Sequence, residues 1–310
     1  MVQWRKHGRL YAAEGAGRHP KLASHASNPL PVHLEGDVYR IFYSGRDDRH
    51  RSSVGAVDID IVTGRIVEDH PEPVITHGAR GSFYADGISI GCVYETAAGS
   101  RHMLFMGWQV ADVPHWRGDI GRFRLTDDLR LQPEGNTPFI GDAPHDPVSL
   151  SYPWVHRWAS GDYTMWYGST WTWDAGNAEM IHVINHATSE DGETWDRKGL
   201  AIPMRIGVAQ AFSRPSMIEH PDGSCDMWFS YRAGGGDRYR IGRAHSADGQ
   251  AWTLDLDGAG IAPSQSGWDS EMVEYPFVFR HGDPGNGRLY MLYNGNGHGR
   301  SGFGLAEADL

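Results

Sequence analysis

Three carboxylates lie within six residues near the C-terminal end of the sequence. They are Asp269, Glu271 and Glu274, in the segment 268–274 (WDSEMVE). Like charges this close repel one another, and the repulsion raises a carboxyl pKa unless a cation, a proton or a ligand relieves it. Apolar neighbours within the segment indicate partial burial, which disfavours ionisation further. The segment is therefore a candidate for acid–base chemistry, and we expect Glu274 to reach a site together with Glu271 or Asp269.

A short phrase that ends in proline or glycine recurs five times along the sequence, each time with an apolar run beside it. The central residues of the phrase are Asn28, Asp86, Tyr152, Arg214 and Tyr275, which by subtraction lie 58, 66, 62 and 61 positions apart. Self-similarity at such a period is typical of one repeated supersecondary unit. The apolar runs last four to seven residues between turn signals, which indicates strands.

The repeat predicts an all-β protein, a five-bladed β-propeller of four-stranded antiparallel blades. We expect one domain over residues 1–310. Its blades should cover approximately residues 24–67, 84–132, 148–199, 211–255 and 268–310. The last blade lacks an outer strand, and an open edge between first and last blades would be a liability. The N-terminal segment 3–11 is therefore expected to close it.

The innermost strand of each propeller blade begins at the mouth of the central channel, so the five phrases should direct side chains into one funnel. We expect Asp86 to act there as a catalytic carboxylate, with Asn28, Tyr152, Arg214 and Tyr275 as substrate-binding residues. Polar groups that converge on a channel are costly unless they are paired or used. A simple ion pair between Asp86 and Arg214, or phrases that only start strands before proline, are the structural alternatives.

Charge and composition exclude several classes of partner. The formal net charge is -11, whereas binding to nucleic acid phosphates demands a surplus of Lys and Arg. No stretch approaches the roughly 20 apolar residues of a membrane span, and the first residues lack a signal-peptide pattern. We expect a cytoplasmic protein with a small-molecule or saccharide substrate. Cys92 and Cys225 lie in strand-like runs of different blades and are expected to be buried free thiols.

Other conspicuous motifs have structural interpretations. The segments 187–195 (ATSEDGETW) and 244–252 (AHSADGQAW) predict hairpin turns through Asp-Gly, with the tryptophan packed between blades. His182 and His186 are four residues apart, but the local pattern is a strand, so they do not form a helical ligand pair. No metal site or cofactor is expected. His298, in a glycine-rich segment, is the histidine expected to reach the channel.

The Asx-Pro phrase of the first blade, the Asp-Gly of the second and the Asp-Gly-x-x-Trp hairpins resemble the five-bladed glycosidase superfamily. This superfamily includes glycoside hydrolase families 43, 32, 62 and 68. Residues 267–276 and 290–296 look like a bacterial branch assigned to the glycosidases and found beside saccharide-biosynthesis genes. The resemblance covers the sequence from about Trp4 to Ala306. It implies a propeller fold and a carbohydrate-active enzyme.

The departures from the superfamily concern its catalytic residues. The resemblance implies an Asp in the first blade, an Asp in the second and a Glu in the third. This sequence has Asn28, Asp86 and the pair Ser151 and Tyr152 at those places, so Asp86 alone is retained. Glycoside cleavage needs one protonated and one ionised carboxyl group. We therefore expect a relocated pair, Asp86 with Glu274 or with another carboxylate of the same loop, whose more desolvated member is the acid.

The resemblance also implies aromatic and cationic contacts with a sugar. The residues expected to make them are Trp108, Trp171, Trp173, Arg232 and His298. A hydrolase or transglycosidase is the main hypothesis. A phosphorylase with Asp86 beside a cationic pocket, a lyase or cyclase, and a sugar-binding protein without catalysis are the alternatives.

Overall fold

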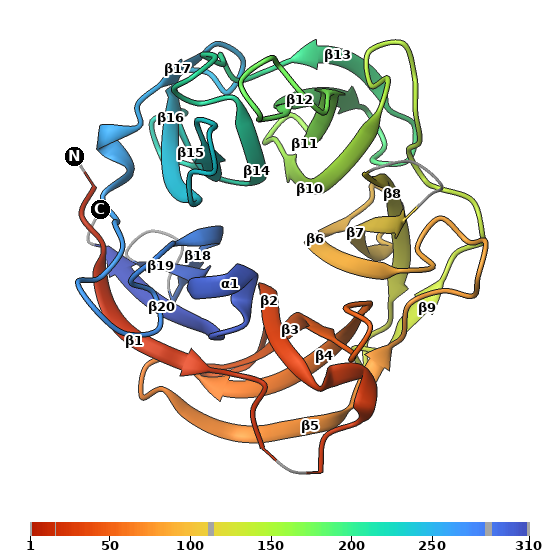
Figure 1. Ribbon diagram of the computed structural model, residues 1–310, viewed down its shortest axis with the longest axis vertical. Helices are drawn as coiled ribbons and strands as arrows, with labels where there is room; N and C mark the ends of the chain where they lie inside the picture. The colour runs from red at the N-terminus through yellow and green to blue at the C-terminus, as the bar shows by residue number, and fades with distance from the viewer. Residues whose placement is uncertain (1, 16, 111–114, 283–286, 309–310) are drawn as a thin grey trace.

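The computed structural model describes residues 2–15, 17–110, 115–282 and 287–308 (Figure 1). Nearly all regular structure in these ranges is β-strand. The helical segments there are single turns, η1 (Pro20–Leu22), η2 (Asp257–Ala259) and α1 (Asn296–Gly299). The predicted all-β class is therefore confirmed. No helix in the described ranges is long and apolar enough to cross a membrane.

Within the described ranges, antiparallel ladders divide twenty strands into five groups of four. The first is β2 (Ser24–Glu35), β3 (Val38–Arg46), β4 (Ser52–Asp60) and β5 (Arg65–Ile75). The second is β6 (Gly87–Glu95), β7 (Arg101–Val110), β8 (Trp116–Leu125) and β9 (Leu131–Pro133). The third is β10 (Ser149–Arg157), β11 (Tyr163–Thr172), β12 (Ile181–Ser189) and β13 (Asp196–Leu200). The fourth is β14 (Ala211–Glu219), β15 (Cys225–Arg232), β16 (Arg240–Ser246) and β17 (Trp252–Leu254). The fifth is β18 (Glu274–His281), β19 (Arg288–Asn294), β20 (Phe303–Ala308) and β1 (Arg5–Tyr11).

The groups surround a common centre, with β2, β6, β10, β14 and β18 innermost (Figure 1). One parallel bridge, Ser52 to Gly87, joins the first and second groups, and His182 to Ala211 joins the third and fourth. The second strands of the groups, such as β11 and β15, are buried along most of their length. They form continuous apolar runs because both of their faces are covered.

The N-terminal strand completes the fifth group. β1 pairs antiparallel with β20, with Arg5 opposite Glu307, as the count of strands predicted. Lys6 Nζ lies 2.6 Å from the buried carboxylate of Asp269, which also accepts a hydrogen bond from Tyr293 at 3.1 Å. Asp269 therefore attaches the N-terminal strand to the fifth group.

Two sequence motifs have the structural roles predicted for them. Asp191 Oδ1 accepts hydrogen bonds from the peptide groups two and three residues later at 2.7 and 2.8 Å, and Asp248 Oδ1 does the same at 2.9 and 3.1 Å. These contacts close the Asp-Gly turns. Trp252 is buried with its ring 5.9 Å from that of Trp166, in the neighbouring group. Both cysteines are buried free thiols, as expected.

The recurring phrases lie at bulges inside the inner strands rather than ahead of them. In β2 the pairing with β3 passes from Ser27 directly to Leu30, and the proline phrases of β10, β14 and β18 show the same shift. The residue before each proline has a left-handed backbone, with φ of 55°, 36°, 51° and 52° at Asn28, Tyr152, Arg214 and Tyr275. Such values are uncommon outside glycine. The structure therefore replaces the expected extended start of a strand with a strained kink.

In the second group Gly91, not Asp86, occupies the equivalent position. The pairing of β6 with β7 passes from Ile90 directly to Val93, which places the bulge at Gly91 and Cys92. Measured from Gly91, the five positions lie 63, 61, 62 and 61 residues apart by subtraction, a more regular repeat than the phrase with Asp86 provides. Asp86 lies five residues earlier, just before β6.

Gly91→Ala is expected to destabilise the protein by about 1–3 kcal/mol through overpacking. A Cβ at this position would come within 2.5 Å of the carbonyl oxygen of Pro153, a backbone atom of the neighbouring group that cannot rotate away. Denaturant unfolding measures the loss. Gly141→Ala is the matched control, because its Cβ would meet nothing closer than 3.5 Å. Equal stability of the two variants would refute the close approach at Gly91.

Candidate functional site

A cavity of about 280 Å³ lies where residues from all five strand groups converge. Its polar and aromatic lining includes Arg46, Arg232, His182, His298, Tyr152, Tyr239, Tyr275, Trp108 and Trp116. The volume is at the lower end of that of small-molecule pockets, which begin at about 300 Å³. The lining contains no Asp or Glu side chain among the described residues. A carboxylate must therefore act on this cavity from behind its surface or from its rim.

Glu274 is the carboxyl group connected to the cavity. It is the first residue of β18, it is fully buried, and its Oε2 lies 3.1 Å from Nδ1 of His298, which lines the cavity. Its Oε1 is buried and has no hydrogen-bond partner among the described residues. Burial raises the pKa of Glu274, and the contact with His298 opposes that shift only in part. The group is thus a carboxyl that retains its proton to higher pH than an exposed glutamate.

Two tyrosines of the recurring phrase meet beside this carboxyl. The Tyr152 hydroxyl donates to the Tyr275 hydroxyl at 3.3 Å, and the ring centroids are 5.3 Å apart. Burial is the main cause that raises the pKa of both phenols. Both phenols therefore remain protonated at neutral pH and can donate hydrogen bonds.

Arg214 does not reach the cavity, contrary to the prediction. The side chain is buried, and it donates from Nη1 to the Tyr275 carbonyl and from Nη2 to the Pro29 carbonyl, both at 2.7 Å. Burial lowers the pKa of its guanidinium to about 9. The cation connects the inner strands of the first, fourth and fifth groups. Its donors are directed to backbone because the bulge turns the side chain between strands.

Two other arginines supply the cations of the cavity. Arg232 forms an ion pair with Glu179 at 2.7 Å and lies over the Tyr239 ring, 4.7 Å from its centroid. Arg46 also lines the cavity, and its guanidinium has no hydrogen bond or ion pair to any described residue. Arg46 was not among the residues predicted from the sequence.

The repeat carries a signal that could have identified Arg46. Ser44 pairs with Ser27, and Ser230 pairs with Ser213, so these serines are equivalent in the first and fourth groups. An arginine follows each of them by two residues, Arg46 in one case and Arg232 in the other. Alignment of the second strands would therefore have placed both arginines at the same end of their groups.

The remaining candidate carboxylates lie outside the cavity. Asp86 Oδ2 accepts a hydrogen bond from the Val110 peptide at 2.7 Å, and the Asp86 peptide donates to the carbonyl of Trp108, a lining residue, at 3.1 Å. Asp86 is thus hydrogen-bonded through its peptide group to a lining residue, but it does not itself line the cavity. Glu271 is exposed, and the prediction that Glu271 or Asp269 lines the site is wrong. The Asp269 carboxylate forms an ion pair with Lys6 instead of facing the cavity, because a buried carboxylate needs a partner cation.

Of the three predicted tryptophans, only Trp108 lines the cavity. Trp108 lines the cavity and donates to Ser52 at 3.1 Å. Trp173 packs edge-to-face on Trp116, a lining residue, with centroids 4.9 Å apart. Trp171 is 38% exposed and lines a separate hollow beside Pro144, so it is not part of this cavity. Asn28 is buried, and its peptide donates to Asn294 at 2.8 Å.

His182 is neutral and held by two hydroxyl groups. Its Nε2 lies 2.6 Å from Ser151 Oγ, and its Nδ1 lies 2.7 Å from Thr170 Oγ1. Burial lowers its pKa to about 3, with a smaller contribution from the Arg232 charge. It contributes a polar but uncharged surface to the cavity wall.

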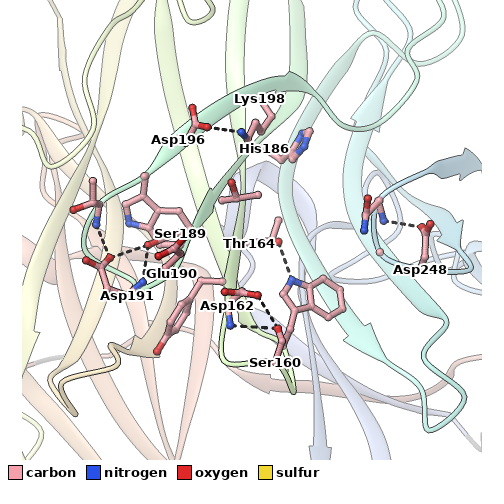
Figure 2. Close-up of a pocket in the computed structure, with 17 residues that line it drawn as sticks. Ser160, Asp162, Thr164, His186, Ser189, Glu190, Asp191, Asp196, Lys198 and Asp248 are labelled. Atoms are coloured by element: carbon pink, nitrogen blue, oxygen red, sulfur yellow. Dashed lines mark hydrogen bonds and ion pairs between the residues drawn. The ribbon is translucent and has the colours of Figure 1, made fainter.

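A larger hollow of about 1110 Å³ lies between the third and fourth groups, among their Asp-Gly turns (Figure 2). Its polar groups are occupied by local contacts. Ser160 donates to Asp162 at 2.9 Å, Ser189 donates to Asp191 at 2.9 Å, and Lys198 forms an ion pair with Asp196 (Figure 2). These are turn caps and exposed pairs, so the hollow offers few free groups for a ligand.

One cluster has the residue types and spacing for a metal ion. Ligand atoms of Asp58, Glu68 and His70 lie within 4.8 Å of one another on β4 and β5. Arg40 holds Asp58 with two hydrogen bonds of 2.8 Å, which already neutralises its charge. The cluster lies on the outer strands and is separate from the central cavity.

Comparison with solved structures identifies the fold. A complex of BT0996 with RGII aligns with a TM-score of 0.74 at 16% identity, over 99% of this protein and 92% of the other. A glycosyl hydrolase from Bacteroides ovatus aligns at 0.72 and 14% identity, over 99% and 93%. A member of the GH130 family of mannoside phosphorylases, which contains glycoside hydrolases for β-1,2-mannosidic linkages in Candida mannan, aligns at 0.71 and 14%, over 99% and 93%. The protein thus has the fold of the propeller glycosidase superfamily.

Sequence comparison identifies nearer relatives. No family model matches the sequence. The uncharacterized proteins MT1551 and Rv1502 from two strains of Mycobacterium tuberculosis are each 40% identical to it over 307 residues, which cover 98% of this protein and 99% of each relative. At this identity and coverage, the protein belongs to the same family as Rv1502 and MT1551 of Mycobacterium tuberculosis.

Proposed function

We propose that this protein is a carbohydrate-active enzyme, a glycoside hydrolase or transglycosidase that binds a saccharide in the central cavity. The observation that carries the proposal is the buried Glu274 carboxyl with its raised pKa, in contact with the cavity through His298. A carboxyl whose pKa is raised by burial keeps its proton to higher pH, which suits the group that assists departure of a sugar's leaving oxygen. The glycosidase fold of the structural neighbours supports this proposal.

In the proposed reaction the bond between the sugar carbon and the leaving oxygen breaks. Glu274 supplies the proton that the leaving oxygen takes up, by way of His298. Asp86, whose peptide group is hydrogen-bonded to the lining residue Trp108, is the second carboxylate, and it accepts the proton of the water that adds to the sugar carbon. Trp108 and Trp116 present aromatic surfaces to the sugar ring. The Tyr275 phenol, which accepts from Tyr152, donates a hydrogen bond to a sugar oxygen.

We also propose how the strand groups form the complete fold. We interpret the five groups of four strands as the blades of one five-bladed propeller domain, in which β1 completes the last blade. Each blade then contributes at least one side chain to the cavity. The site would consequently depend on the whole ring rather than on any one blade.

One observation favours a second candidate function. Among the described residues the cavity lining contains no carboxylate, as a sugar-binding protein without catalysis would allow. A phosphorylase is the catalytic alternative, since the Arg46 guanidinium could receive inorganic phosphate. Nitrophenyl glycosides assayed with and without added phosphate separate these functions. Release without phosphate supports the hydrolase, release that requires phosphate supports the phosphorylase, and binding of the sugars without release supports the binding protein.

Asp86→Asn is expected to lower turnover by about 100-fold, the lower range for loss of an acid–base group. The melting temperature should change little, because the amide oxygen of Asn can still accept the Val110 peptide hydrogen bond. Steady-state kinetics and thermal unfolding measure the two effects. A variant that loses stability in step with activity would mark Asp86 as a structural cap instead.

A further inference from the structure

Among the described residues, the cavity has one free cationic group, the Arg46 guanidinium, and no free carboxylate in its lining. The Arg46 guanidinium has no hydrogen bond or ion pair to a described residue. The next residue, Asp47, forms an ion pair with Arg51 at 2.8 Å and is therefore occupied. Glu179 is occupied by Arg232, and the raised pKa of Glu274 favours its neutral form. An unpaired guanidinium in a concave site is suited to an oxyanion.

Further basic groups lie around Arg46. The pKa of His25 is lowered to about 4, first by burial and then by the charges of Arg46, Arg300, His50 and His298. Contacts in the fold support this placement. His25 follows Ser24, the residue opposite Arg46 in the pairing of β2 with β3, and the Ser27 hydroxyl donates to the His298 carbonyl. Arg46 and Arg300 are therefore the fixed positive charges near the junction between β2, the end of β3 and the α1 turn.

The backbone is strained at the same junction. His25, His50 and His298 have left-handed backbones, with φ of 62°, 63° and 57°. Such values are uncommon outside glycine, although histidine adopts them more often than most residues, and residues held in sparsely populated backbone regions cluster at functional sites and ligand clamps. Three strained histidines around one free arginine indicate a preorganised site rather than a solvated charged surface.

We propose that the cavity binds a saccharide that carries a phosphate group, and that Arg46 binds this group. This inference rests on the proposed function and adds a substrate class to it. Arg46 donates to the phosphate oxygens from the end of β3. Trp108 and Trp116 then face the sugar ring. A cavity of about 280 Å³ suits a single phosphorylated sugar unit better than a long polysaccharide.

Calorimetric titration with matched ligands tests the inference. The ligands are glucose with glucose 6-phosphate, mannose with mannose 6-phosphate, and sodium phosphate alone. We expect at least one sugar phosphate to bind about 10-fold or more tightly than both its neutral sugar and inorganic phosphate. Equal affinity for neutral and phosphorylated sugars, or no binding of either sugar phosphate, would overturn the proposal. Inorganic phosphate that binds as tightly as the sugar phosphates would show a site for the free ion and would also overturn it.

Variants at Arg46 test whether this side chain is the group that binds the phosphate. Arg46→Gln should remove the advantage of the phosphorylated sugar, a loss of about 10-fold or more, while Arg46→Lys retains part of it because the charge remains. Arg65→Gln is the control, since Arg65 is exposed on the outer strand β5. Unchanged affinity in a folded Arg46→Gln variant would refute the role of Arg46. Glu274→Gln should still prefer the sugar phosphate, so failure of the catalytic proposal and failure of this inference give different results.

Discussion

Glu274→Gln should lower turnover by about 10²- to 10⁴-fold, the range for removal of a general acid, without loss of the fold. The amide keeps the size of the side chain but has no acidic proton to transfer. Turnover is measured with a glycoside, neutral or phosphorylated, whose glycosidic bond the wild-type protein cleaves. Glu271→Gln is the matched control three residues earlier, because Glu271 is exposed and outside the cavity lining. Loss of activity in the Glu271 variant alone would show that the acid has been assigned to the wrong residue.

The dependence on pH gives this prediction a second measurement. The raised pKa of Glu274 keeps the acid protonated to higher pH, so activity should fall as pH rises through that raised pKa. The free energy of unfolding should also fall as pH rises through the raised pKa of Glu274. A carboxyl whose pKa is higher in the folded state stabilises the fold below its unfolded pKa, and this contribution is lost as pH rises through the folded pKa. The Gln variant should therefore lose less stability than the wild type on the alkaline side.

Arg214→Ala should lower the free energy of unfolding by about 3 kcal/mol or more. The substitution removes two hydrogen bonds from a charged donor, each worth about 1.5–3 kcal/mol, and leaves a cavity among inner strands. The Tyr275 and Pro29 carbonyls would lose the guanidinium that connects them. Denaturant unfolding measures the change, with exposed Arg65→Ala as a control expected within about 0.5 kcal/mol of the wild type. A stable Arg214→Ala variant that fails only in ligand binding would contradict the structural role.

Several features of this protein follow from short stretches of sequence. Apolar runs of strand length between turn signals predict the all-β class, since side-chain alternation and turn chemistry are local properties. The Asp-Gly turn at Asp191 forms from contacts within three residues, which the motif itself contains. The count of strands also predicts that the N-terminal segment pairs with the last group.

The composition of the site depended on contacts between distant residues. The register of β6 places Gly91 rather than Asp86 at the bulge, because a shift of pairing cannot be read from the phrase alone. Lys6 lies 263 positions from Asp269, yet their ion pair removes that carboxylate from the candidate acids. The burial of Glu274 distinguishes it from Glu271, although the two are three residues apart in the same acidic segment.

The arginines show the same division between sequence and tertiary structure. The sequence alone determined that arginines occur in the repeated strand segments, Arg214 in the recurring phrase and Arg46 and Arg232 two residues after equivalent serines. Only the folded ring decided which cations face a ligand. The bulge directs Arg214 to backbone carbonyls, Glu179 neutralises Arg232, and Arg46 remains without a partner among the described residues. The physical reason is that the availability of a charge depends on burial and on partners from other strands, and both are set by long-range packing.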